Sequence, residues 1–254
     1  MQKEITTTAS AVVVDNLTKD YGDVRAVDGL SITIHEGEVF GLLGPNGSGK
    51  TTTINCLVGL LKPSKGIIKV GNFEVTTQGA EARSIMGVSP QETAVYPYLT
   101  GRENVKLFGE LCSVPKKTLD ARVDEMMEKV GLLEECDRRV GKYSGGMKRR
   151  VSIAMALVHD PKIIILDEPT VGMDPQSRRA VWDFIMELRD RGKTIVLTTH
   201  YMEEAEEICD RVGIIDHGKL IALGTPTELR SKYGARDLED VFIQLTGRQI
   251  REGS

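Results

Sequence analysis

The chain has 254 residues, of which 40% are hydrophobic and 28% charged. This composition is typical of one folded domain, with or without a subdomain, and argues against a disordered chain. The formal net charge of −4 argues against nucleic acid as the main partner, because a phosphate backbone needs a basic surface. The cysteines lie far apart without a CxxC pair, which argues against zinc or a disulfide framework and indicates a reducing cytosol.

No segment of the sequence reads as a leader or a membrane span. Residues 1–10 contain no apolar stretch of the signal-peptide kind. The longest apolar runs, such as residues 56–61, fall far short of the roughly 20 residues needed to cross a bilayer. We therefore expect contact with a membrane only through a partner.

Short β-branched runs alternate with helical stretches along the chain. Strands are predicted at residues 11–17, 31–34, 39–43, 163–166 and 194–199. The last three are nearly all apolar, as expected of strands buried on both faces of a parallel sheet. Two apolar stretches within residues 213–221 flank His217-Gly218-Lys219, which predicts a hairpin at a sheet edge.

Several helices carry clear start signals. Thr100, with Glu103 three residues later, makes a capping box before a helix over residues 105–111. Asp174 followed by Pro175 is an N-cap with proline at the first helical position, and this helix should run to about residue 190. Further helices are predicted to begin after Thr225 and Asp237.

The distribution of these elements predicts an α/β core with a helical insertion. Residues 92–143 hold helical patterns but no good strand, and the inserted subdomain is placed at about residues 92–160. The domain as a whole is placed at residues 11–235. Residues 236–254 are expected to form a short C-terminal helix and tail.

Residues 44–51 match GxxxxGK[ST], the phosphate-binding P-loop. Its glycines let backbone N–H groups point at phosphate oxygens, and the positive end of a following helix, residues 50–61, adds to this. Lys50 would reach the β- and γ-phosphates, and the Thr51 hydroxyl would ligate Mg²⁺. The alternative is a glycine-rich turn that matches by chance. The expected nucleotide-binding residues are Gly44, Pro45, Asn46, Gly47, Ser48, Gly49, Lys50, Thr51 and Thr52.

Two acids end the predicted buried strand at residues 163–166. Such a strand delivers its carboxylates beside the P-loop, where open α/β sheets bind ligands. Asp167 would hold Mg²⁺, and Glu168 would orient and polarise the attacking water. Read alone, the pair is also consistent with a strand running into a turn at Pro169.

The Ser-Gly-Gly at residues 144–146 is a candidate anion site. Ser144 is a good N-cap, and the paired glycines leave backbone N–H groups open. Three cations at residues 148–150 follow, at the end of the helix where the dipole disfavours positive charge. This arrangement indicates that a strongly negative group docks there; the alternative is a solvated basic helix start.

In their order and spacing, these motifs resemble the ATP-binding cassettes of ABC transporters. The resemblance covers about residues 11–245. It implies an α/β fold of the P-loop NTPase class, with a RecA-like core, a mostly parallel sheet, an N-terminal antiparallel β portion and an inserted helical subdomain. It also implies hydrolysis of ATP with Mg²⁺.

The resemblance assigns roles across a dimer. In the family, two cassettes pair head to tail, and each ATP lies between the P-loop of one subunit and the signature of the other. Ser144, Gly145 and Gly146 would therefore contact the partner's nucleotide. Asp174 would communicate across the dimer.

Three further positions match the family's pattern. Gln91 would sense Mg²⁺, as one of its ligands, and also the transmembrane partner. His200 would contact the γ-phosphate, although taken alone it reads more readily as a satisfied histidine at a strand end. Tyr21 would stack on adenine, although alone it reads as a tyrosine beside a turn.

The Tyr-Ser-Gly-Gly-Met signature and the ending at residues 238–247 are similar to the ABC-2 branch of drug, antibiotic and polysaccharide exporters. We therefore expect a cytoplasmic subunit, peripheral on the inner face of the cell membrane, that pairs with a second copy and drives separate transmembrane permease subunits. The alternative is an ATPase of the same type acting as a nucleotide-gated clamp on a non-transport partner. Glu168 and His200 together oppose a clamp that never hydrolyses. The absence of an Asn-Lys-x-Asp motif argues against a GTPase.

Overall fold

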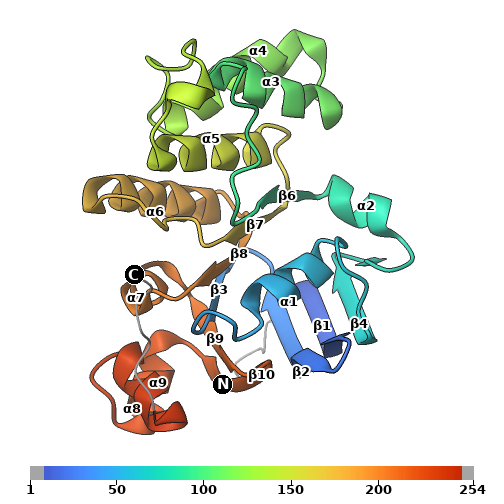
Figure 1. Ribbon diagram of the computed structural model, residues 1–254, viewed down its shortest axis with the longest axis vertical. Helices are drawn as coiled ribbons and strands as arrows, with labels where there is room; N and C mark the ends of the chain where they lie inside the picture. Colours follow the sequence, from blue (N-terminus) through green and yellow to red (C-terminus); the bar gives the residue numbers. More distant parts are fainter. Residues whose placement is uncertain (1–8, 248–254) are drawn as a thin grey trace, which may run out of the picture.

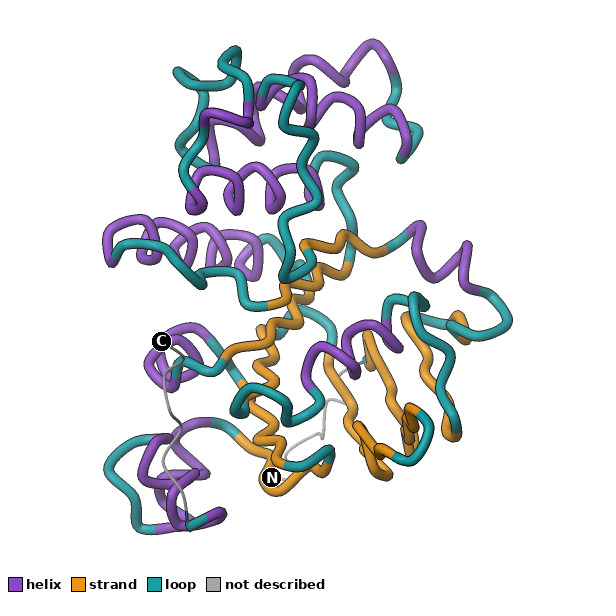
Figure 2. The backbone as a smooth tube through the Cα atoms, viewed as in Figure 1, coloured by secondary structure: helices purple, strands orange, loops and turns teal. Residues whose placement is uncertain are grey.

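The computed structural model describes residues 9–247 and confirms the α/β fold (Figure 1). Residues 1–8, within the N-terminal stretch that shows no leader pattern, lie outside this range. So do residues 248–254, at the end of the predicted tail. An antiparallel sheet has the order β2-β1-β4-β5 and a larger sheet the order β10-β9-β3-β8-β7-β6 (Figure 2). The strands are β1 (Ser10–Tyr21), β2 (Val24–His35), β3 (Val39–Leu43), β4 (Lys65–Val70), β5 (Phe73–Glu74), β6 (Met86–Ser89), β7 (Ile163–Asp167), β8 (Thr194–Thr199), β9 (Arg211–Asp216) and β10 (Lys219–Gly224).

The helices flank these sheets and extend away from them at both ends of the molecule. Figure 1 shows α3, α4 and α5 together at one end and α8 and α9 at the other. The helices are α1 (Lys50–Leu57), α2 (Gly79–Ser84), α3 (Gly101–Leu111), α4 (Lys116–Lys129), α5 (Gly145–Leu157), α6 (Pro175–Asp190), α7 (Met202–Ile208), α8 (Pro226–Tyr233) and α9 (Leu238–Thr246), with a 3-10 turn η1 (Val140–Lys142) before α5.

The centre of the larger sheet is parallel and fully buried. β3, β7 and β8 pair parallel and in register, and every one of their residues is buried. Their continuous apolar, β-branched sequences are what a strand covered on both faces requires. Leu43 lies opposite Thr199 and Asp167 opposite Thr198, so the three carboxyl ends meet at one edge. The segments after these strands are thereby brought together.

The antiparallel elements agree less closely with the predictions. β1 and β2 are longer than expected, because β1 continues to Tyr21 and β2 already begins at Val24. β4 and β5, and also β6 of the larger sheet, were not predicted. Most residues of β4 are exposed, β5 has only two residues, and β6 has four, one of them a glycine. The edge hairpin is confirmed, since β9 and β10 pair antiparallel around His217 and Gly218.

The helix start signals are confirmed. Thr100 and Glu103 form the capping box of α3, and the Asp174 side chain accepts the N–H of Ser177 at 2.9 Å at the start of α6. α3, α4 and α5 follow β6 and precede β7, within the segment proposed as the inserted subdomain. They share one apolar cluster with the parallel strands.

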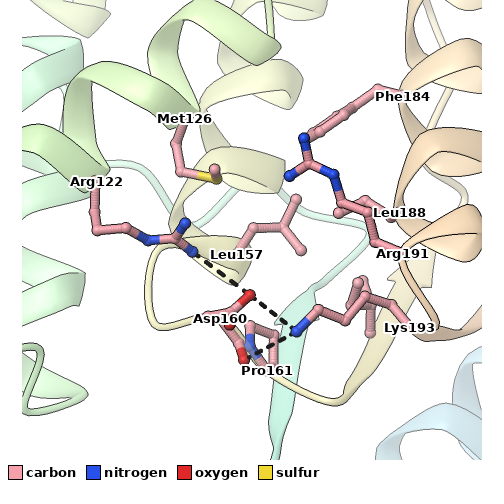
Figure 3. A pocket seen from close by; sticks show the side chains of 10 residues that line it. Arg122, Met126, Leu157, Asp160, Pro161, Phe184, Leu188, Arg191 and Lys193 are labelled. Carbon is pink, nitrogen blue, oxygen red and sulfur yellow. Dashed lines mark hydrogen bonds and ion pairs between the residues drawn. The ribbon is translucent and has the colours of Figure 1, made fainter.

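Asp160 links the helical part to the sheet, at a small pocket between α4, α5 and α6 (Figure 3). Its carboxylate lies 2.9 Å from the ammonium of Lys193, just before β8, and 3.7 Å from the guanidinium of Arg122 on α4. Hydrogen bonding from Lys193 lowers the pKa of Asp160. The side chains of Met126 and Phe184 line the apolar part of the pocket. This pocket therefore joins the two parts by ion pairs and apolar contacts.

The final helix packs on its own domain. Leu238, Val241 and Phe242 of α9 are buried and belong to the same apolar cluster as the parallel strands. The backbone N–H of Leu238 donates to the Glu206 carboxylate of α7 at 2.6 Å. Helix α9 therefore adds to the stability of the core.

Phe242→Ala should lower the free energy of unfolding by roughly 3 kcal/mol or more, because it removes a fully buried ring and leaves a cavity. Urea unfolding followed by circular dichroism measures the change. Gln244→Ala on the exposed face of the same helix is the matched control and should change it by less than about 0.5 kcal/mol. Equal effects of the two substitutions would contradict the packing of α9.

Candidate active site

The P-loop connects β3 to α1 and depends on its glycines. Gly47 and Gly49 have φ of 79° and 106°, in the left-handed region that side chains disfavour. At Gly49 a Cβ would also meet the carbonyl oxygen of Ala26 at 2.5 Å. Gly49 is the N-cap of α1 and offers no side-chain cap, so the first N–H groups of the helix face the loop without a side-chain acceptor. A cavity of about 250 Å³ opens in front of this loop.

Lys50 lies at the centre of the P-loop. Its side chain is 4% exposed, and its ammonium donates to the carbonyls of Gly44 at 2.8 Å and Pro45 at 3.1 Å. Burial lowers the pKa of Lys50, and the charges of Glu168 and Asp167 partly offset this. The cation is thus held beside the cavity at the position where the P-loop motif requires it.

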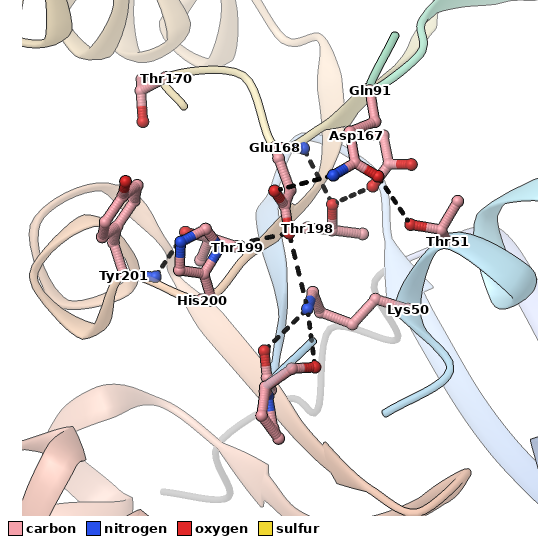
Figure 4. Close-up of polar contacts among 12 residues, drawn as sticks. Lys50, Thr51, Gln91, Asp167, Glu168, Thr170, Thr198, Thr199, His200 and Tyr201 are labelled. Carbon is pink, nitrogen blue, oxygen red and sulfur yellow. Dashed lines mark hydrogen bonds and ion pairs between the residues drawn. The ribbon is translucent and has the colours of Figure 1, made fainter. Parts of the chain in front are cut away.

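Glu168 stands at the meeting point of the site (Figure 4). It follows β7 and is 5% exposed. One carboxylate oxygen lies 3.6 Å from Lys50 Nζ and 3.2 Å from His200 Nδ1, and the other accepts from Gln91 Nε2 at 3.2 Å. Burial alone would raise the pKa of Glu168, but His200 and Lys50 outweigh it and hold the pKa below its ordinary value. The carboxylate is therefore ionised at neutral pH.

Asp167 and Gln91 bring further oxygen atoms to the same place. Asp167 is 2% exposed and accepts from the hydroxyl of Thr198 on the neighbouring strand. The Gln91 side chain lies between Glu168 and the P-loop: its amide nitrogen donates to Glu168, and its oxygen lies 3.5 Å from the Thr51 hydroxyl. Three oxygen-bearing groups thus gather beside the P-loop.

His200 is tied to Glu168. It follows β8, and its side chain is 9% exposed. Its ring packs against Tyr201 with 4.2 Å between centroids, while the backbone N–H of Tyr201 donates to Thr199 Oγ1 at 2.9 Å. The structure gives His200 a hydrogen-bonding partner at this strand end, because its Nδ1 lies 3.2 Å from the Glu168 carboxylate.

Of the remaining predicted residues, Gly145 lines a neighbouring cavity together with Gln91 and Glu168, whereas Ser144, Asp174 and Tyr21 do not line it. Residues 144–146 and Tyr21 do not line the P-loop cavity. Ser144 is exposed and caps α5 by accepting the N–H of Met147 at 3.2 Å, and Asp174 caps α6. Tyr21 is 47% exposed at the end of β1, with the Lys19 ammonium 5.2 Å from its ring centre. These side chains are available to a ligand or partner outside the cavity.

Two of the three cations at residues 148–150 donate hydrogen bonds inside the protein instead of pointing toward an outside anion. The Arg149 guanidinium is buried and donates to backbone carbonyls, among them that of Pro169. Arg150 donates to the carbonyls of Val130 at 3.0 Å and Gly131 at 3.2 Å. A guanidinium carries several donors in a fixed plane, and both arginines use theirs to satisfy backbone carbonyls inside the protein.

Sequence reasoning also missed Glu204. It is 1% exposed on α7, and its carboxylate accepts from the Thr170 hydroxyl at 2.7 Å and the Trp182 indole at 2.8 Å. Burial raises the pKa of Glu204. It thereby joins α7, which follows His200, to the loop after Glu168. In a run of four glutamates nothing distinguishes this one except its place on the inner face of the helix.

Comparison with known proteins identifies the family. The ABC transporter family model matches residues 27–171. The chain is 44% identical over 238 residues to the linearmycin resistance ATP-binding protein LnrL of Bacillus subtilis, covering 94% of this chain and 75% of that protein. It is 46% identical over 227 residues to the Nod factor export ATP-binding protein I of Burkholderia lata, covering 89% and 75%.

A solved structure shares the fold. It is the dimeric, post-hydrolysis ATP-binding cassette MJ0796 bound to ADP and phosphate, with a TM-score of 0.78 and 28% identity over 84% of this chain and 98% of that one. Family, relatives and fold agree with a P-loop that meets an ionised glutamate. This chain belongs to the ABC transporter family, as an ATP-binding subunit with ATPase activity.

Proposed function

We propose that this subunit drives export through separate transmembrane permease subunits, by closing and opening a dimer of two copies as ATP is bound and hydrolysed. The observation that carries the proposal is the gathering of the Glu168 carboxylate with Lys50, Gln91 and His200 beside the P-loop. The signature at residues 144–146 lies outside the cavity that it would complete from a second copy.

The cluster supports a division of labour in hydrolysis. Lys50 and the N–H groups at the start of α1 bind the β- and γ-phosphates. Glu168 is ionised and buried, so it accepts a hydrogen bond from the attacking water and orients it in line with the γ-phosphate. His200, held against Glu168, contacts the γ-phosphate, and Tyr21 stacks on adenine from the end of β1.

The residues at the cavity edge fit Mg²⁺. The Thr51 hydroxyl, the Gln91 amide oxygen and the Asp167 carboxylate are hard oxygen donors, and the first two lie 3.5 Å apart. Mg²⁺ prefers such ligands together with phosphate oxygens and water. The ion would neutralise charge on the β- and γ-phosphates. The Thr198 hydroxyl donates to the Asp167 carboxylate and holds it in place at the strand end.

Pairing of two copies accounts for the signature's exposure. Ser144 is an exposed N-cap whose neighbours Gly145 and Gly146 offer N–H groups to an anion. The dimeric cassette similar to this chain is a precedent for such a pair. Asp174, at the exposed start of α6, faces the same partner and carries the communication between the two sites.

The membrane role comes through the permease. Within residues 9–247 no helix is long and apolar enough to cross a bilayer. The relatives described above are named for drug resistance and for Nod factor export, which supports export as the direction. We place the subunit in the cytoplasm, peripheral on the inner face of the membrane. A clamp on a non-transport partner is disfavoured by these relatives.

Glu168→Gln should abolish turnover and leave ATP binding intact, because it removes the charge that orients water while keeping the shape of the side chain. The loss in kcat should be 10²-fold or more, to order of magnitude. Phosphate release and fluorescent-nucleotide titration measure the two quantities. Lys50→Ala is the contrasting variant, expected to lose binding itself. Tight binding by Lys50→Ala, or full turnover by Glu168→Gln, would refute the assigned roles.

ATP, but not ADP, should dimerise the Glu168→Gln variant, because only ATP offers the γ-phosphate that Ser144 and its neighbours would bind across the interface. Sedimentation with each nucleotide measures the change. Adding Ser144→Arg should prevent closure while sparing binding at the P-loop. A dimer that persists in the double variant would show that the signature does not meet the partner's nucleotide.

A further inference from the structure

Glu168 has an unusual backbone conformation for a residue on which catalysis depends. Its φ is 52°, in the left-handed region that residues with a Cβ rarely adopt. Such conformations persist at functional sites when surrounding contacts hold them. Part of the support is the neighbouring strand, because the N–H of Glu168 donates to the Thr198 hydroxyl at 2.9 Å and to its carbonyl at 3.2 Å.

The other part comes from Arg149 on α5. Its guanidinium donates to the carbonyls of Asp167 and, at 3.3 Å, of Pro169. These two residues stand immediately before and after Glu168. One rigid, planar group therefore holds the chain on both sides of the glutamate and fixes the direction in which its carboxylate leaves the strand end.

The same guanidinium holds the segment that carries Gln91. Its remaining nitrogen donates to the carbonyls of Pro90 and, at 3.0 Å, of Gln91 itself. Arg149 thus fixes the backbones of both partners in the hydrogen bond between Gln91 and Glu168. The guanidinium is 4% exposed, and the charges of Asp167, Glu168 and Glu204 compensate it.

Arg149 also connects this pair to the signature. α5 runs from Gly145 to Leu157 and is capped by Ser144, so the residues expected to meet the partner's nucleotide and the arginine share one helix. We propose that Arg149 is a positioning residue for hydrolysis, which sets the orientation of Glu168 and Gln91 from the signature helix. The inference rests on the proposed function, because it takes Glu168 to be the group that orients water.

The test compares Arg149→Met and Arg149→Lys with Arg150→Met. Arg150 is the matched control: it is the next residue of the same helix and also donates to two loop carbonyls, but those of Val130 and Gly131, away from Glu168. Arg149→Met should lower kcat by about 10- to 100-fold, because a misplacement of about 1 Å costs this much. The Kd for ATP should change by less than about 3-fold.

Arg149→Lys should recover part of the kcat that Arg149→Met loses. An ammonium can hydrogen-bond to the loop around Glu168 or to the loop that carries Gln91, but it lacks the planar guanidinium that reaches both. Arg150→Met should keep kcat within about 2-fold of the parent, even where its melting temperature falls. A parent-like kcat in Arg149→Met, or an equal loss of kcat in Arg150→Met, would overturn the inference.

A double substitution separates positioning from general damage. In the Glu168→Gln background, Arg149→Met should cause a much smaller loss of single-turnover rate than in the parent, because the carboxylate that it positions is already gone and only Gln91 remains to be misplaced. A full additional loss would show a merely structural role and overturn the inference. Parent-like turnover by Glu168→Gln alone would instead overturn the proposed function, so the two failures are distinguishable.

Discussion

The parallel register of β3, β7 and β8 is the constraint on which the site depends. Because the strands run in the same direction and are paired opposite one another, the segments that follow them leave the sheet at one edge. Those segments carry Lys50, Glu168 and His200. These groups are far apart in sequence, and the ladder of backbone hydrogen bonds brings them to one edge. The continuous apolar strands that bury this ladder are therefore as necessary to the chemistry as the polar groups.

Because the segments after these strands meet at one edge, opposite charges lie together where they are buried. Their proximity sets the protonation state of each group. Lys50 and Glu168 are each about nineteen-twentieths buried, which penalises both charges. Each offsets the cost of the other, and His200 adds to the stabilisation of the carboxylate. A pKa below its ordinary value keeps Glu168 ionised at neutral pH, as its proposed role in orienting water requires. The ion pair between Lys50 and Glu168 also explains why the carboxylate lies close to the P-loop.

The sequence predicted the elements whose local pattern and tertiary role agree. The bounds of β3 and β8 follow from uninterrupted apolar runs, and the capping residues of α3 and α6 lie where their side chains indicated. β6 was missed, since a four-residue strand with a glycine has too little pattern to be read. The P-loop, Glu168 and His200 were predicted by motif and resemblance, and their mutual contacts could come only from the fold.

Arg149 and Glu204 show where local pattern fails. A basic residue at a helix start and a glutamate in an acidic run both read as solvated surface, yet each is almost fully buried. Their partners are a carbonyl or hydroxyl of the loop around Glu168, brought near by packing of α5 and α7 on that loop. A single amino-acid sequence carries no local sign of such contacts. Arg149 reaches this loop from α5 and Glu204 reaches it from α7, so the loop that carries the left-handed Glu168 is held from two helices.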